Sequence, residues 1–406
     1  MRRLRIVLML MLGSCVPPEP DTAPVPLSRD PDIRVGVLVD VRQATLGGDG
    51  LIVDDPGEGN LRTIPAGSAL SVAARGANVS LSGSGARIER QVLLVRPLDS
   101  TGGITINGRM YRGTVELRRS ETGFIVVNVV PLEQYIAGVV GSEMGIRAPD
   151  EIEALKAQAI VSRTYAVRNQ GRWKARGFDL VGGVSDQVYA GQLNETPLAI
   201  AAVAATRGMV VTWEGQPIDA FYSSTCGGRT EDGPAAFGGA ARPYLHAVED
   251  RDPTGAPWCA ASPRYHWKAG WTASQLATIL RKTLAAEKLP GGRATDLRDV
   301  RVGSHTASGR IATLELLGRN GSTALAGQTM RRVLAPPEGG LLWSTDFTIR
   351  VSRSGNKLER IDVDGRGNGH GVGMCQWGAI GRARAGQDFR TILTSYFPGT
   401  DVQHLY

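Results

Sequence analysis

Residues 104–115 read Ile-Thr-Ile-Asn-Gly-Arg-Met-Tyr-Arg-Gly-Thr-Val, and they indicate the fold more directly than any other stretch. Asn107-Gly108 is a strong two-residue turn signal, and the alternating segments on either side of it predict a β-hairpin. Upstream, short apolar segments separated by glycine-rich turns repeat at the spacing of an all-β unit. We expect strands at residues 33–39, 61–64, 69–73, 92–95 and 104–106.

Helical signals begin after this region. Asp150, with Glu153 three residues later, is typical of a capped helix start, and the Ala-rich run to Asn169 predicts a helix. The fold class that follows is α+β: β-rich with Gly-rich loops and a few helices, plus a small N-terminal β domain. Further expected elements are helices at 196–206 and 272–287, a strand at 209–213 and a hairpin of 311–317 with 323–325.

The composition excludes several classes of protein. Of the 406 residues, 42% are apolar and 21% are charged, which is not the pattern of a fibrous or wholly disordered chain. The formal net charge is +7, but the cations after residue 5 are scattered, without a run of five or six. We therefore expect no nucleic-acid partner.

The N-terminal segment predicts export. Its basic start and the apolar run from Ile6 to Leu12 are typical of a secretory signal, and the run is too short to span a bilayer. The residues before Cys15 resemble a bacterial lipobox, which predicts that Cys15 is lipidated and anchors the protein in the cell envelope, at the periplasmic face of a membrane in a diderm cell. The alternative is a plain signal that is cut elsewhere. The expected division is a signal peptide at 1–15, a Pro-rich tether at 16–32, a β-rich region at 33–99 and one catalytic domain at 100–402.

Glu143 is the first candidate for chemistry. It follows Gly138-Val-Val140, which we interpret as an apolar turn, and it precedes Met144. Apolar surroundings raise the pKa of a carboxyl because desolvation disfavours the charged form, so such a group can donate a proton at neutral pH. The alternative is an ordinary acid that faces solvent.

Two other stretches combine glycine with polar or sulfur-containing residues. Residues 178–191 suit either a sugar-binding loop or a structural turn. Cys226, which precedes two glycines, is a nucleophile, a metal ligand or half of a disulfide with Cys259, and export favours the disulfide. A metal site of Cys226, Cys259 and Cys375 has weak support because the CxxC spacing of many zinc sites is absent.

Residues 367–379 contain too much glycine for a helix start, and they predict a tight, exposed loop. They lack the phosphate-loop pattern. His370 and Cys375 fit a thiol–imidazole pair of a Cys–His hydrolase. They equally fit a loop-bonded histidine beside a small buried cysteine, and both interpretations remain open at this point.

Taken in order, these segments resemble the SpoIID/LytB family of stage II sporulation protein D and amidase enhancer. The similarity covers residues 100–402, whereas 33–99 match only loosely. The matching stretches are 130–135, 138–144, 153–166, 185–191, 224–230, 369–379 and 392–400.

The resemblance implies an exported lytic transglycosylase that cleaves MurNAc–GlcNAc bonds of peptide-stripped peptidoglycan strands and leaves 1,6-anhydro-MurNAc ends. It places the catalytic glutamate, a general acid and base, at Glu143. One carboxyl suffices because the muramyl C6 hydroxyl is the nucleophile, whereas an ordinary glycosidase needs two. For Arg163 and Tyr165 the alternative is a buried structural role. The candidates for substrate binding are Lys156, Arg163, Tyr165, Gln187, Tyr189, Ser224, His370 and Gln376.

The sequence departs from the family pattern at two positions. Some relatives have a histidine in reach of cysteines and zinc, and Ser223 stands at that position here. Because this possible metal ligand is missing, we expect no cofactor. The alternative is zinc at Cys226 and Cys259. Cys375 stands where a serine is usual, which argues against a nucleophilic role. The alternative function is a non-catalytic glycan-binding module that enhances a cell-wall amidase, which would then be its protein partner.

Overall fold

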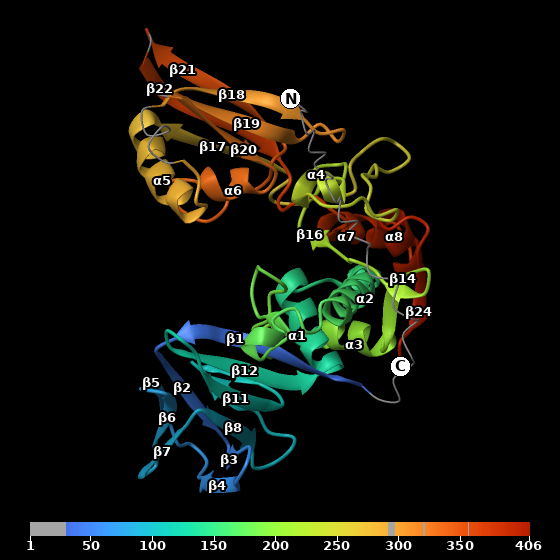
Figure 1. Cartoon of the computed structure of the whole chain (residues 1–406). Helices are drawn as coiled ribbons and strands as arrows, with labels where there is room; N and C mark the ends of the chain where they lie inside the picture. The colour runs from blue at the N-terminus through green and yellow to red at the C-terminus, as the bar shows by residue number, and fades with distance from the viewer. Residues whose placement is uncertain (1–29, 291–296, 320, 356) are drawn as a thin grey trace, which may run out of the picture.

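The computed structural model describes residues 30–290, 297–319, 321–355 and 357–406. The predicted signal peptide, Cys15 and most of the tether lie outside the described residues. The described part is rich in strands, with several sheets and a few helices, which confirms the predicted α+β class (Figure 1). Within it, no helix is both long and apolar enough to cross a membrane.

Two sheets form the N-terminal part of the described chain, at the lower end of Figure 1. The first runs in the order β13 (Leu180–Val181), β1 (Asp32–Val41), β12 (Phe124–Pro131), β11 (Thr114–Arg119), β8 (Val92–Pro97), β3 (Leu51–Asp55) and β4 (Gly59–Ile64). The second runs in the order β10 (Arg109–Tyr111), β9 (Ile104–Ile106), β2 (Gln43–Gly48), β5 (Leu70–Arg75), β6 (Asn78–Gly83) and β7 (Ala86–Arg90).

The predicted hairpin is confirmed as β9 and β10. Asn107 and Gly108 have φ angles of +46° and +80°, as a two-residue turn with both central residues in the left-handed region requires. β8 and β11 lie on either side of residue 99 and pair with each other. One sheet therefore spans the position at which a boundary between 33–99 and 100–402 is expected.

A helical layer packs through α1 on β1 and β12 of the first sheet, and it shares a hydrophobic core with both sheets. The helix predicted over residues 150–169 is confirmed as α2, which is buried along most of its length. The predicted Asp150 cap is wrong, because Asp150 lies within a 3₁₀ turn before α2, and α2 starts without a side-chain cap. The helices are α1 (Leu132–Met144), α2 (Ile152–Arg168), α3 (Pro197–Ala205), α4 (Gly233–Phe237), α7 (Gln376–Arg384) and α8 (Phe389–Tyr396), with 3₁₀ turns at Pro149–Glu151 and Lys174–Arg176. The strands beside them are β15 (Gln216–Pro217), β14 (Met209–Trp213) and β24 (Asp401–His404) in one sheet, and the parallel pair β16 (Tyr222–Ser223) and β23 (Met374–Cys375).

The remaining elements form a unit with its own core, at the upper end of Figure 1. Two of its tryptophans, Trp267 and Trp271, are buried and donate their indole N–H groups to backbone carbonyls. The range 100–402 therefore does not share one continuous hydrophobic core. The elements of this unit are β17 (His266–Thr272), β22 (Lys357–Arg366) and β21 (Phe347–Ser354) in one sheet, β18 (Leu297–His305), β19 (Ile311–Gly318) and β20 (Gly321–Ala326) in another, and helices α5 (Ala273–Ala286) and α6 (Thr329–Val333).

Candidate functional site

Glu143 lies near the C-terminal end of α1, and the turn expected at Gly138 is wrong because the helix continues through it. The helical glycines serve close packing. A Cβ on Gly138 would lie 2.6 Å from the Gly191 carbonyl oxygen, and a Cβ on Gly141 would lie 2.1 Å from the Asn194 carbonyl oxygen. Glycine therefore lets the segment that follows β13 lie directly on α1, with its backbone against Glu143.

Three donors from separate segments hold the Glu143 carboxylate. Oε1 accepts the Val188 backbone N–H at 2.9 Å and the Tyr222 hydroxyl at 3.2 Å. Oε2 accepts the Gln376 side-chain amide at 3.4 Å. All three donors are neutral, so they position the carboxylate without adding a positive charge beside it.

Two fully buried glutamines, Gln158 and Gln187, orient the side-chain donors Gln376 and Tyr222. The Gln376 amide also donates to Gln158 Oε1 at 3.3 Å, which fixes its nitrogen toward Glu143. Gln187 accepts the Tyr135 hydroxyl and donates to the Tyr222 hydroxyl, both at 3.2 Å. The Tyr222 oxygen is thereby occupied as an acceptor, and its own proton points to Glu143.

Burial raises the pKa of Glu143 above the usual value for a glutamate. The hydrogen bonds from Val188, Gln376 and Tyr222 stabilise the charged form and oppose this effect, but they do not cancel it. Glu143 therefore keeps its proton to a higher pH than an exposed glutamate, which is the property a general acid needs near neutral pH.

Glu143 faces a cavity of about 250 Å³. Among the residues that line it, the other carboxylic acid is Asp186, whose side chain is buried and paired with Arg172 at 2.9 Å. Asp186 also accepts the Tyr165 hydroxyl and a backbone N–H, so its oxygens are already engaged. Glu143 is thus the acid in this cavity that is available to a ligand.

Phe221 and His370 line the cavity, and the ring of Phe237 packs against both of them. The ring of Phe221 lies 5.0 Å from that of Phe237, which in turn lies 5.1 Å from the His370 ring. Phe237 is 47% exposed, and Val184, which also lines the cavity, is 87% exposed. These apolar surfaces suit packing against the C–H face of a sugar ring.

His370 is a neutral hydrogen-bonding residue in the cavity wall. Its Nδ1 accepts the Val372 backbone N–H at 3.1 Å, and burial lowers its pKa to about 3, with Arg331 and Arg310 adding to the effect. Cys375 instead directs its sulfur toward the backbone N–H groups of α7 and of Cys226. The geometry does not place the Cys375 thiol in a pair with the His370 imidazole.

The glycine-rich segment is not the exposed loop that we expect from its composition. Residues 371–376 are buried, and α7 begins at Gln376. A Cβ on Gly373, whose φ is +69°, would lie 2.2 Å from the Phe221 carbonyl oxygen. Glycine is required here because this segment packs backbone to backbone against β16, which composition does not reveal.

Five of the predicted substrate-binding residues lie at or directly behind the cavity. Tyr165, Ser224, His370 and Gln376 line it. Gln187 is fully buried behind Tyr222, so it positions another side chain and does not itself face the cavity.

Lys156, Arg163 and Tyr189 do not line the cavity. Arg163 is fully buried and binds both carboxylate oxygens of Glu133, at 2.7 and 2.6 Å. Tyr189 is buried and donates to Asn128 at 2.9 Å, while Lys156 pairs with a carboxylate one turn away on α2. Their expected contact with substrate is not supported, because their polar groups are already engaged inside the fold or along the helix.

Three groups around Glu143 are absent from the sequence-based predictions: the Tyr222 hydroxyl, the Gln158 amide and the Val188 backbone N–H. Tyr222 stands two residues before Ser224, so alternation along a strand would have placed both on one side. A backbone N–H leaves no signal in the identity of its residue, and only the fold brings it to the carboxylate.

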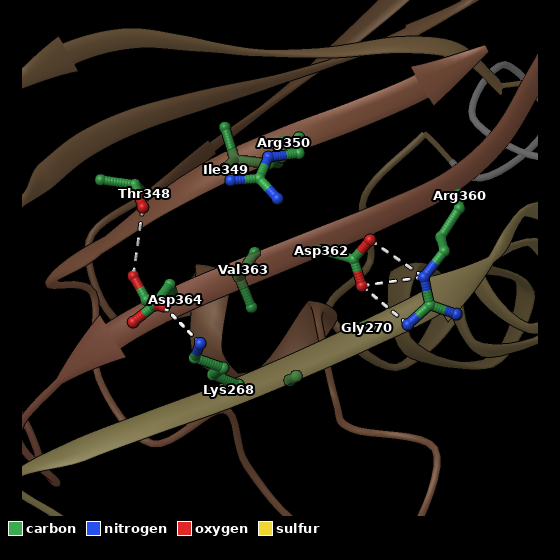
Figure 2. Close-up of a pocket in the computed structure, with 10 residues that line it drawn as sticks. Lys268, Gly270, Thr348, Ile349, Arg350, Arg360, Asp362, Val363 and Asp364 are labelled. Carbon is green, nitrogen blue, oxygen red and sulfur yellow. Dashed lines mark hydrogen bonds and ion pairs between the residues drawn. The ribbon is translucent and has the colours of Figure 1, made fainter.

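A larger hollow of about 710 Å³ lies elsewhere, on the outer face of the sheet formed by β17, β22 and β21 (Figure 2). Its carboxylates are paired: Asp362 with Arg360 at 2.7 Å and Asp364 with Lys268 at 3.2 Å. These are exposed ion pairs of the kind that cover sheet faces, so this hollow lacks the acid that the Glu143 cavity offers.

Three cysteines form a separate buried group. Cys226, Cys259 and Cys375 are free thiols, and the Cys226 and Cys259 sulfurs lie 3.7 Å apart, so the structure contains no disulfide between them. Asp250 joins them, and the four ligand atoms lie within 4.8 Å of one another. In the part of the chain that the structure describes, these are the residues with the arrangement to hold a metal ion.

Two family models match parts of the chain. The model of the family described as "Stage II sporulation protein" matches residues 120–213, which include α1, α2 and Glu143. A second match, "Domain of unknown function (DUF8618)", covers residues 258–373 and so corresponds to the unit with the second core.

Individual relatives are similar to this chain over a longer range than the family models. Stage II sporulation protein D of Bacillus subtilis is 34% identical over 291 residues, which cover 68% of this chain and 75% of that protein. An uncharacterized protein of Brachyspira hyodysenteriae is 31% identical over 75% of each chain. The amidase enhancer of Bacillus subtilis is 28% identical over 74% of this chain and 45% of its own length. The chain belongs to the SpoIID/LytB family, which includes stage II sporulation protein D.

Proposed function

We propose that the protein is an exported lytic transglycosylase that cleaves the MurNAc–GlcNAc bonds of peptidoglycan strands. The observation that carries this proposal is the state of Glu143. It is a carboxyl of raised pKa, held by neutral donors from three segments, on the wall of a cavity that contains no other available acid among its lining residues.

The reaction needs one group that first gives and then takes a proton. Protonated Glu143 donates its proton to the bridging oxygen as the bond from the muramyl C1 to that oxygen breaks. The muramyl C6 hydroxyl attacks C1, and the Glu143 carboxylate accepts the proton of that hydroxyl. The products are a 1,6-anhydro-muramyl end and a free GlcNAc hydroxyl, and Glu143 returns to its protonated form without consuming water.

The carboxylate arrangement favours this reaction over ordinary hydrolysis. Hydrolytic glycosidases use two carboxyls about 5–9.5 Å apart, one of which activates water or attacks the sugar. The second acid of this cavity, Asp186, forms an ion pair with Arg172 and accepts hydrogen bonds from neutral donors. An internal hydroxyl of the substrate removes the need for that second group.

The substrate and location follow from the same proposal. Peptide-stripped glycan strands suit a cavity of about 250 Å³ that is lined by the rings of Phe221 and His370. An N-terminal signal with lipidation at Cys15 would export the protein and keep it at the membrane, close to this polymer.

The test is digestion of purified peptidoglycan, intact and after amidase treatment, followed by mass spectrometry. Ring closure releases products about 18 Da lighter than those of hydrolysis, the mass of one water. If these lighter products appear only after amidase treatment, the enzyme requires peptide-stripped strands. Products of hydrolytic mass would contradict the ring-closing mechanism.

A second candidate function is enhancement of a cell-wall amidase by glycan binding without cleavage. It is favoured by the similarity to a protein named amidase enhancer, which spans 74% of this chain. The two functions differ in the need for Glu143: stimulation of an amidase that survives Glu143→Gln, in a protein that cuts neither substrate, would favour the enhancer.

A further inference from the structure

Cys226, Asp250, Cys259 and Cys375 come from three distant segments and meet in the interior. None of the four is more than 1% exposed. Cys226 follows β16, Asp250 and Cys259 lie on the long connection before β17, and Cys375 ends β23. Their ligand atoms lie within 4.8 Å of one another.

The spacing of these atoms matches a tetrahedral metal site. With zinc–sulfur bonds of about 2.3 Å, two sulfurs of a tetrahedron lie about 3.8 Å apart. The Cys226 and Cys259 sulfurs are 3.7 Å apart, and the Cys226 sulfur lies 3.1 Å from Asp250 Oδ2. A disulfide would instead require about 2.05 Å between sulfurs.

We propose that Cys226, Asp250, Cys259 and Cys375 bind one Zn²⁺ ion in a closed, four-coordinate site. Three thiolates and one carboxylate are a donor set that suits zinc, and four protein ligands leave no open position for water or substrate. Binding releases the thiol protons to solvent. The site is structural and is independent of the proposed glycan chemistry.

Backbone N–H groups point at two of the three sulfurs. The Cys226 sulfur accepts the Gly228 N–H at 3.3 Å, and the Cys375 sulfur accepts the N–H groups of Cys226 at 3.1 Å and Gly378 at 3.3 Å. Backbone N–H groups that point at sulfur are the outer-shell partners expected of a thiolate metal ligand.

Asp250 is oriented in the same manner. Its Oδ1 accepts the Tyr396 hydroxyl at 2.7 Å and the Arg382 guanidinium at 3.3 Å. These bonds leave Oδ2 turned toward the sulfurs, and the buried Arg382 cation offsets part of the negative charge of the ligand set. A Cβ on Gly378 would lie 2.2 Å from Oδ2, so the start of α7 must be glycine at this point.

The position of the site gives it a task. β16 and β23 pair in parallel, and they place Cys226 and Cys375 directly beside the segments that carry Tyr222 and Gln376. Both of these side chains donate to Glu143. A zinc ion that joins the two segments would fix the cavity wall from behind.

The first experiment measures metal in the full protein, purified without chelators. We expect about one zinc per chain, and cobalt exchanged into the site should give the intense visible bands of tetrahedral Co²⁺ together with thiolate-to-cobalt charge transfer. Neither measurement requires a variant that folds or an active enzyme, so failure of the glycan chemistry would not affect them.

Thiol mapping distinguishes the alternatives. After chelation and unfolding without reductant, Cys226, Cys259 and Cys375 should all alkylate. A Cys226–Cys259 disulfide without metal would overturn the proposal, as would three free thiols that take up neither zinc nor cobalt.

Substitution then assigns the ligands. Cys259→Ser and Asp250→Ala should each reduce zinc content at least about tenfold, because each removes one of four ligands. Ser262→Ala is the matched control, since Ser262 is buried in the same connection but bonds to Thr225, and it should retain its zinc. Retention of full zinc in both ligand variants would overturn the assignment.

Discussion

The Gln376 side-chain amide lies 3.4 Å from Glu143 Oε2, although 233 residues separate the two in the sequence. The same amide nitrogen reaches Gln158 on α2, so one glutamine at the start of α7 links that helix to both α1 and α2. Glu143 therefore depends on the C-terminal part of the chain for its position, even though the family model that contains it ends at residue 213.

Glu143→Gln should abolish formation of anhydro-muramyl products. Gln keeps the size of the side chain but neither gives nor takes a proton in this reaction, and general acid–base catalysis contributes about 10²–10⁴-fold to a rate. Product formation is followed by mass spectrometry. Glu338→Gln, a charge-matched change at an exposed position, should leave the rate unaltered. Equal activity of Glu143→Gln and the unaltered protein would disprove the assigned role.

Tyr222→Phe should extend activity to higher pH. The Tyr222 hydroxyl stabilises the ionised form of Glu143 and so lowers its pKa. Removal of the hydroxyl raises the pKa of Glu143 further, so the catalytic acid stays protonated to higher pH. The alkaline limb of the kcat/KM profile therefore shifts to higher pH. Tyr244→Phe is the control: it removes a hydroxyl that donates to Asp219, and it should not shift the profile. A limb that stays in place or moves downward would contradict this role of Tyr222.

Arg163→Met should destabilise the fold by about 3–5 kcal/mol, because it leaves the Glu133 carboxylate buried without its cation. The free energy of unfolding is measured with denaturant. Arg168→Met on the same helix breaks a half-exposed pair with Asp219 and should cost less than about 1 kcal/mol. Similar losses in the two variants would show that Arg163 does not have the structural role assigned to it.

Gly138→Ala should destabilise the protein although alanine favours helices. The intrinsic gain is about 1 kcal/mol. Against it stands a Cβ placed 2.6 Å from the Gly191 carbonyl oxygen and 2.7 Å from the Tyr189 ring, and overpacking of this kind costs about 1–3 kcal/mol. Thermal unfolding and the anhydro-product assay should both show a loss, since the displaced segment carries the Val188 donor. Gly183→Ala, which meets no atom within 4 Å, should be neutral; a stabilised Gly138→Ala would refute the packing argument.

Elements with local signals can be predicted from the sequence alone. Asn107-Gly108 demands a turn with two positive φ angles, and it forms one. The predicted helix around residues 150–169 and the predicted helix after Thr272 are present, the latter with a complete capping box between Thr272 and Gln275. In each case the residues that set the conformation lie within a few positions of one another, so no distant contact was needed to predict it.

Features that depend on contacts between distant segments cannot be predicted in this way. The sequence around Gly138 predicts a turn, whereas the glycine lies within a helix, where it lets the backbone of Gly191 pack against α1. Arg163 and Tyr165 lie two residues apart on α2, yet the first is buried against Glu133 and the second lines the cavity. The direction in which each side chain points is set by neighbours from elsewhere in the chain, because burial and hydrogen bonding are decided by what packs around a residue and not by the residues beside it in sequence.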